Sequence, residues 1–333
     1  MKLSLGTEEC VNQLLKDLFI NLRKKVNRWS KLTGQTSQAK MGYIGQHLVS
    51  AVTGFKGGKS GARGKDLILS NGQYAEIKTC TKVDQLGKCK DCGEPVSFFE
   101  TRCPKCGSIN VLKKDDSKWL INIKKETSPE NGPQDSEDVL TNILKPTYYF
   151  FVLFEFEDIE DVKSPIVVTI YRVNPNQNGF VLCMLDYFYN LKHKTAFNMW
   201  PHMLKFDLCN PQIIYRSKIK SNDSIETIVF KPHEPEETPF TLHKYIRSNN
   251  FKKYCHNVLA EYGIELSDNY TTTEILDKIE QFNETHNLSH SERRTMFAKG
   301  FYRERIELLK SELEQKGKTV PSIFDEFVNS GDR

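Results

Sequence analysis

The chain has 333 residues, of which 38% are hydrophobic and 27% are charged, and its net charge is +4. This length allows two domains or one large domain with insertions, and the near balance of charge requires any nucleic-acid-binding surface to be local. Because no apolar run is long enough for a membrane span and no signal-peptide pattern is evident, we expect a cytoplasmic protein.

Two helices are predicted at the start of the chain. In residues 8–32, apolar residues recur at helical spacing from Val11 to Trp29, and basic residues lie on the opposite face. The apolar stripe is most simply core packing, and the basic face is either solvated or in contact with a DNA backbone. Residues 39–49 read as a second helix that leads to Thr53-Gly54.

A basic, glycine-rich loop follows at residues 54–65, with five glycines, four cations and no acid. Glycine lets a backbone approach another surface closely, and lysine and arginine supply phosphate contacts. The loop is either a flexible solvated segment or the rim of a DNA-binding site. Its candidate DNA-binding residues are Lys56, Lys59, Arg63 and Lys65.

The next residues predict a hairpin, with strands on either side of a turn at Asn71-Gly72. Glu76 and Lys78 are two apart and share one face of the second strand, and Asp66 begins the first strand. Two carboxylates and an ammonium at one end of a hairpin suit Mg²⁺ and metal-assisted phosphodiester hydrolysis. An acid and a lysine at this spacing are also common on solvent-facing strands.

Two CxxCG motifs, with ten residues between Cys92 and Cys103, predict a zinc ribbon at about residues 86–111. Zn²⁺ takes four thiolates in a tetrahedron, and a site filled by sulfur is structural. Two disulfides would need an oxidising compartment, and a redox pair needs only one motif. The expected zinc ligands are Cys89, Cys92, Cys103 and Cys106. The other five cysteines are expected to be buried thiols: Cys10, Cys80, Cys183, Cys209 and Cys255.

Beyond the ribbon, a strand at 118–124 is expected to lie beside the strand of Glu76. A buried central strand is predicted at 147–155. Further elements in this middle region are a strand at 165–173, a helix at 179–192 and short strands near 202–207, 211–216 and 226–231. After Pro239, the pattern predicts helices at 241–262, 272–284 and 290–316. The last helix pair is either a DNA-binding helix-turn-helix or a packing or dimerisation unit.

The order Asp66, nine residues, Glu76, one residue, Lys78 resembles the PD-(D/E)XK nuclease motif, although Lys65 stands where that motif has proline. With the helix and the glycine-rich loop before it, this region (roughly 38–125) resembles type II restriction endonucleases of the MamI-like kind. The resemblance implies an α/β fold with a PD-(D/E)XK restriction-endonuclease-like core, in which helices flank a mixed central sheet. The corresponding domains are a nuclease domain at 1–238, with the zinc ribbon inserted, and a C-terminal helical region at 239–333.

The resemblance also assigns roles. Asp66 and Glu76 would be the Mg²⁺ ligands, and Lys78 would orient the attacking water and stabilise the charge that develops on phosphorus. Gln46 stands where many members have a metal-binding glutamate, so we expect it to be a supporting residue.

We therefore expect a sequence-specific, Mg²⁺-dependent endonuclease that cuts double-stranded DNA and leaves 5′-phosphate and 3′-hydroxyl ends. A homodimer matched to a palindromic site and a cognate DNA methyltransferase in the same system are further expectations. Two alternatives stay open at this point. One is a repair, resolvase or transposon nuclease on the same core, and the other is a non-catalytic zinc-ribbon DNA-binding protein.

Overall fold

The computed structural model describes residues 3–35, 40–58, 65–82, 87–96, 102–112, 118–122, 143–157, 161–190, 196–201, 203–242, 245, 249–264 and 271–317. The chain divides into two compact units. The first contains Met1–Trp119, Thr147–Arg172 and Gln212–Glu236, and the second contains Leu120–Pro146, Val173–Pro211 and Glu237–Arg333. The C-terminal helices thus pack with middle segments of the chain, and the expected nuclease domain at 1–238 stays a prediction.

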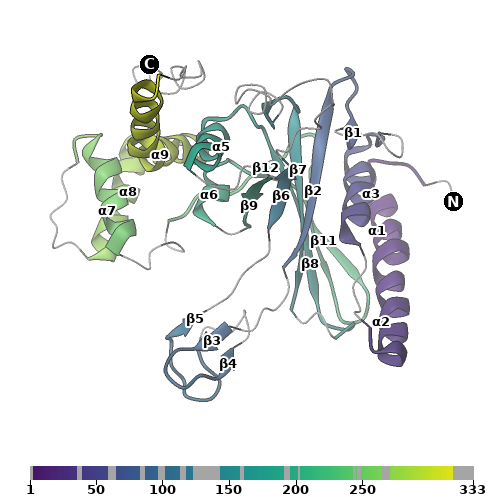
Figure 1. Ribbon diagram of the computed structural model, residues 1–333. Coiled ribbons are helices and arrows are strands. Elements are labelled where there is room, and N and C mark those ends of the chain that lie inside the picture. The colour runs from purple at the N-terminus through teal and green to yellow at the C-terminus, as the bar shows by residue number, and fades with distance from the viewer. Residues whose placement is uncertain are drawn as a thin grey trace. The chain divides into compact units, whose positions relative to one another are not determined.

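A mixed, seven-stranded sheet forms the centre of the first unit (Figure 1). Its strands run in the order β1-β2-β7-β8-β10-β11, and β12 pairs with β10. The β2–β7 pair is parallel, whereas β1–β2, β8–β10 and β10–β11 are antiparallel. The strands are β1 (Leu67–Ile68), β2 (Tyr74–Lys82), β7 (Tyr148–Phe156), β8 (Ile166–Val173), β10 (Gln212–Ile219), β11 (Ile225–Phe230) and β12 (Glu236–Glu237).

The N-terminal helices of this unit cover one face of the sheet (Figure 1). The predicted helix at 8–32 is confirmed, with one turn of π-helix inside it. The helices are α1 (Glu8–Leu14), η1 (Leu15–Ile20), α2 (Asn21–Thr33) and α3 (Met41–Thr53). Their apolar side chains join alternate residues of the strands in one core, for example Val11, Leu48, Ile77 and Val152. This packing leaves the opposite set of alternate residues, including Glu76 and Lys78, on the other face of β2.

The ribbon has its own three-stranded sheet, of order β4-β3-β5, built from β3 (Gly87–Cys89), β4 (Pro95–Val96) and β5 (Val111–Leu112). Gly93 and Gly107 follow the second cysteine of each motif, with φ of 77° and 70°. This left-handed conformation is one that glycine adopts without strain, so each CxxC turn can close tightly.

In the second unit, α9 packs against α5 and α7, and α7 packs against α8. Capping boxes at Thr271 and Ser289 fix the starts of α8 and α9 where the sequence predicted them. A two-stranded sheet pairs β6 with β9. The elements are α5 (Asn178–Asn190), β9 (Ala196–Met199), α6 (Leu204–Asp207), α7 (Asn249–Ala260), α8 (Thr272–Thr285), α9 (His290–Gln315) and β6 (Trp119–Asn122), the first residue of which belongs to the first unit.

Two expectations about the middle region were wrong. The strand at 118–124 does not lie beside the strand of Glu76, because β7 occupies that position and β6 pairs with β9. The strand near 202–207 is instead the short helix α6. The first error concerns a strand whose partner is distant in the sequence, where local pattern carries little information, and the second concerns a helix of only four residues. Among the described helices, none has the length and apolar character needed to cross a bilayer.

Candidate functional site

The hairpin of β1 and β2 brings Asp66, Glu76 and Lys78 together in the first unit. In this hairpin Leu67 pairs with Ala75, and Gly72 in the turn has a φ of 79°. Lys78 Nζ lies 2.7 Å from Glu76 Oε2. Both side chains are largely buried, with 14% of the Glu76 side chain and 23% of the Lys78 side chain exposed.

Asp66 sits where the short strand β1 begins. Its Oδ2 accepts a hydrogen bond of 2.9 Å from the backbone amide of Ile77. Ile77 lies on β2 just past the two residues that pair with β1, so the Asp66 side chain provides the partner for this amide. Its Oδ1 accepts a bond of 3.0 Å from Gln46 Nε2, on α3. Gln46 therefore contacts the predicted site, where its side-chain amide donates a hydrogen bond to Asp66.

The electrostatic environment of Glu76 includes the carboxylate of Asp66. Burial raises the pKa of Glu76, the Lys78 ammonium acts against this rise, and the Asp66 carboxylate adds to it. Two carboxylates that share a desolvated position repel each other, and a cation placed between them would relieve this repulsion. Both carboxylates carry hard oxygen donors, which are the ligands that Mg²⁺ prefers.

Close packing between α3 and β2 holds Gln46 near Asp66. A Cβ added at Gly45 would lie 1.9 Å from Thr79 Oγ1, so only glycine permits this approach of the helix to the strand. Gly45 and Thr79 thus set the position of the neighbouring Gln46 on α3.

Two tyrosines adjoin the carboxylates and were not identified from the sequence. Tyr149 pairs with Glu76 across the β2–β7 ladder and is 2% exposed, and burial together with the charge of Glu76 raises the pKa of its phenol well above the usual value. Tyr74 precedes Glu76 by two residues, and burial and the charge of Glu76 raise its pKa. Alternation along β2 could have revealed Tyr74, whereas Tyr149 depends on a strand register that the sequence does not display.

Of the candidate DNA-binding residues, the structure describes Lys56 and Lys65, whereas Lys59 and Arg63 lie outside the described residues. The carbonyl of Lys56 accepts a hydrogen bond of 3.0 Å from the amide of Ile68, so the beginning of the glycine-rich loop runs beside β1. Lys65 Nζ lies 5.6 Å from the centre of the Tyr74 ring. Both lysine side chains are exposed close in sequence to Asp66.

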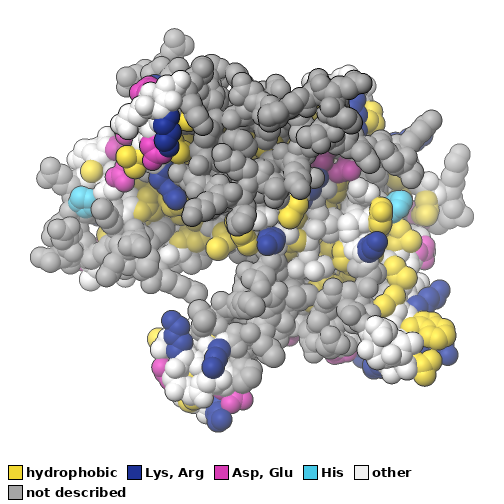
Figure 2. Space-filling view, viewed as in Figure 1, with side chains coloured by type: hydrophobic (Ala, Val, Ile, Leu, Met, Phe, Trp, Pro, Cys, Tyr) yellow, Lys and Arg dark blue, Asp and Glu magenta, His cyan; other side chains and the backbone are white. Residues whose placement is uncertain are grey.

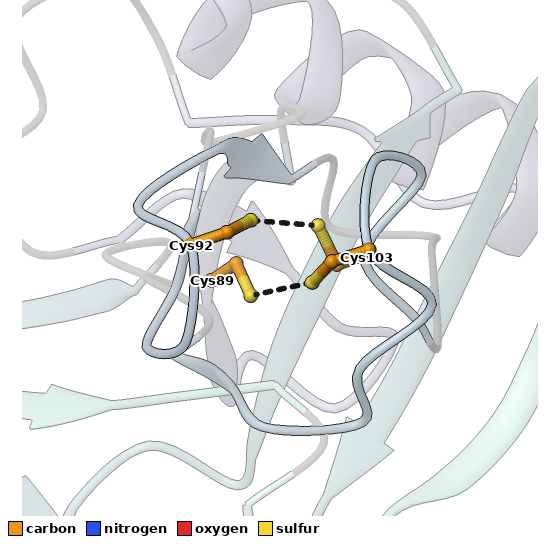
Figure 3. Close-up of side chains that lie close together, drawn as sticks. Cys89, Cys92 and Cys103 are labelled. Carbon is orange, nitrogen blue, oxygen red and sulfur yellow. Dashed lines mark hydrogen bonds between the residues drawn. The ribbon is translucent and has the colours of Figure 1, made fainter.

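The four cysteines of the ribbon converge, as predicted, and their sulfur atoms all lie within 4.8 Å of one another. Cys89 Sγ is 3.6 Å from Cys106 Sγ, and Cys92 Sγ is 3.5 Å from Cys103 Sγ (Figure 3). Sulfur atoms at the corners of a zinc tetrahedron, with Zn–S bonds of about 2.3 Å, would be separated by about 3.8 Å. The donor set and its spacing therefore fit Zn²⁺.

Backbone amides around the cluster favour thiolates, whereas burial and the neighbouring sulfurs raise the pKa of Cys92 and Cys106. Side-chain hydrogen bonds join the two halves of the ribbon. The amide of Cys92 points to the Cys89 sulfur and lowers the pKa of this thiol to about 7. Asp91, in the first motif, accepts hydrogen bonds from Ser108 and Asn110, which follow the second motif. The remaining five cysteines are buried and form no disulfide, as expected.

Comparisons with known proteins agree with these features. A family model described as MamI restriction endonuclease matches residues 28–244. A stretch of 74 residues is 39% identical to the type II restriction enzyme MamI of Microbacterium ammoniaphilum and covers 21% of this chain and 23% of that enzyme. The chain thus matches less than a quarter of the length of this relative. No solved structure shows a significant match.

Proposed function

The chain belongs to the MamI restriction endonuclease family, and from this we propose that it is a type II restriction enzyme that hydrolyses double-stranded DNA at a specific sequence. The observation that carries the proposal is the meeting of Asp66, Glu76 and Lys78 at one end of a hairpin. The same three residues carry the likeness to the PD-(D/E)XK motif, and the mixed sheet with helices against it is compatible with such a core.

We assign Asp66 and Glu76 as the residues that would hold Mg²⁺. When bound there, the ion would favour ionisation of a water and offset negative charge on the phosphate. The protein contributes the geometry, because the Ile77 amide and the Gln46 side chain fix both oxygens of Asp66 before substrate arrives. Gln46 acts in this scheme as a positioning residue.

We assign to Lys78 a direct contact with the reacting atoms. Its ammonium is held at the site by Glu76, and we expect it to donate a hydrogen bond to the attacking water or to a non-bridging phosphate oxygen. The water gives up a proton to solvent as its oxygen bonds to phosphorus, the bond from phosphorus to O3′ breaks, and O3′ takes up a proton. The products are a 5′-phosphate and a 3′-hydroxyl.

DNA contacts beside this centre would come from the basic loop. Lys56 and Lys65 are exposed near Asp66, where an ammonium can pair with phosphates that flank the scissile one. We extend the same role to Lys59 and Arg63 from their places in the sequence. These contacts would position the duplex without reading its bases.

We further propose that the four cysteines bind Zn²⁺ with a structural role, because a zinc ion with four protein sulfur ligands has no free position for substrate.

A homodimer would supply one active site to each strand of a palindromic sequence. A DNA methyltransferase in the same system would protect the host DNA, and a reducing cytoplasm would preserve the zinc-binding thiols.

Digestion of a bacteriophage genome tests this proposal. The protein is incubated with the DNA and Mg²⁺, and the ends of the products are sequenced. We expect discrete fragments that share one short sequence at their 5′-phosphorylated ends. Preferential cutting of branched or damaged DNA would assign the protein to repair, and DNA binding without nicking at any protein excess would exclude a nuclease.

A further inference from the structure

The exposed surface of α2 carries two adjacent stripes of different chemistry. Lys24, Arg28 and Lys31 follow one another at intervals of four and three residues, and all are exposed. These intervals place side chains on one line along a helix. Trp29 and Leu32 lie on the neighbouring line and are 63% and 75% exposed.

A hollow of about 680 Å³ lies along these stripes. It is lined by the three cations, by Trp29 and Leu32, and also by Asn27 and Val162, all within the first unit. Figure 2 shows hydrophobic side chains gathered at the lower right, where Figure 1 places α2, with Lys and Arg side chains around them. Small-ligand sites commonly have volumes of about 300–1,000 Å³, so this hollow can take one nucleotide unit.

The positive charge of this surface favours an anionic ligand. Lys24 pairs with Asp223, but in the part of the chain that the structure describes no carboxylate lies within ion-pair distance of Arg28 or Lys31. A two-fold contact with a second copy would place these cations against each other. A polyanion instead pairs with the cationic stripe and releases counterions.

The exposed indole distinguishes unpaired from duplex nucleic acid. In a duplex, the faces of the bases are stacked on one another, whereas an unpaired base offers its face to an aromatic side chain. A cationic groove beside an aromatic platform is the usual arrangement of proteins that bind single strands. On α2, Trp29 has an exposed aromatic ring, and Arg28 and Lys31 are exposed cations beside it.

We propose that the α2 surface is a second nucleic-acid site, which binds an unpaired nucleotide segment with a base on Trp29 and phosphates on Arg28 and Lys31. The site is separate from the hairpin centre. Val162 lies in the turn after β7, whereas Glu76 pairs with Tyr149 near the start of β7, and seven residues of strand span roughly 20 Å. The proposal therefore does not depend on cleavage at Glu76.

Titration of the full chain with fluorescein-labelled (dT)₁₂ tests the site in buffer without divalent metal. We expect binding with quenching of tryptophan emission. Loss of one stacked base corresponds to about 5-fold or more in affinity, so Trp29→Ala should weaken binding at least about 5-fold and remove most of the quenching. Trp29→Phe should retain most of the affinity, because it keeps an aromatic face.

Charge variants provide the matched comparison. The double variant Arg28→Gln/Lys31→Gln should weaken (dT)₁₂ binding and flatten its salt dependence. The control double variant Lys16→Gln/Lys218→Gln removes two exposed charges elsewhere and should change neither the affinity nor its salt dependence.

Equal affinity for (dT)₁₂ in wild type, Trp29→Ala and the Arg28/Lys31 variant would overturn the proposal. The proposal would also be overturned if light scattering showed a dimer for the wild type and a monomer for Trp29→Ala while (dT)₁₂ binding stayed intact. The surface would then be a self-association face. Duplex cleavage, measured separately, reports on the hairpin centre alone.

Discussion

At the scale of single residues, Glu76 is placed at a cost to folding. Its raised pKa means that the folded state favours the protonated carboxyl, so its contribution to stability is present at low pH and is lost as the pH rises through the folded pKa. Binding of a cation needs the opposite, ionised form. A buried carboxylate with a perturbed pKa is a candidate for a functional role, which agrees with the role proposed for Glu76.

Glu76→Gln should therefore lose Mg²⁺-dependent cleavage and keep or raise the melting temperature near pH 8, because the desolvated charge is removed. Differential scanning calorimetry and a plasmid assay measure the two effects. Glu226→Gln is the control, because a hydrogen bond to Lys220 lowers the pKa of this exposed carboxyl. That variant should cut normally and gain no stability. A marked loss of stability in Glu76→Gln would contradict this account of its environment.

Gln46 gives a second prediction at this scale. Gln46→Leu removes the hydrogen bond to Asp66 Oδ1 and leaves the carboxylate free to rotate. Groups that orient a metal ligand typically affect affinity by about 10- to 100-fold. The Mg²⁺ concentration for half-maximal cleavage should rise about 10-fold or more, with DNA affinity unchanged. An unchanged Mg²⁺ requirement would show that Gln46 does not position Asp66.

At the scale of elements, the contact between α3 and β2 is the feature that aligns the site. Gly45→Ala would force the new methyl group into Thr79, and overpacking of this kind costs about 1–3 kcal/mol. Urea denaturation should show that loss. Gly42→Ala, on the same helix with no atom within 4 Å of the added Cβ, should be neutral or stabilise by up to about 1 kcal/mol. Similar effects of both substitutions would exclude a tight α3–β2 contact.

The ribbon gives a prediction on metal content. Elemental analysis of the purified protein should find about one zinc ion per chain, as one tetrahedral sulfur site requires. Cys103→Ser should lose most of this zinc. Cys10→Ser, which alters a buried thiol outside the ribbon, should retain it. Zinc retained by Cys103→Ser, or absent from the wild type, would refute the assignment.

At the scale of the whole molecule, local patterns predicted more than long-range pairings. The hairpin, α3, the ribbon and the starts of α8 and α9 were predicted correctly because turn glycines, cysteine spacing and capping residues are local signals. The parallel β2–β7 pair was missed, since parallel strands need a long connection and nothing near Glu76 indicates Tyr149. The grouping of middle segments with the C-terminal helices is equally non-local.

In the proposed function Asp66, Glu76 and Lys78 form one phosphodiester-cleaving centre, and single-turnover cleavage of plasmid DNA by Lys78→Ala tests this most directly. Lys218→Ala, which removes an exposed lysine from β10, is the control. We predict that Lys78→Ala slows cleavage by about 10²- to 10³-fold or more, as loss of a charge-stabilising donor does, and binds DNA as the wild type does. Cleavage by Lys78→Ala at the rate of the wild type and of Lys218→Ala would contradict the account.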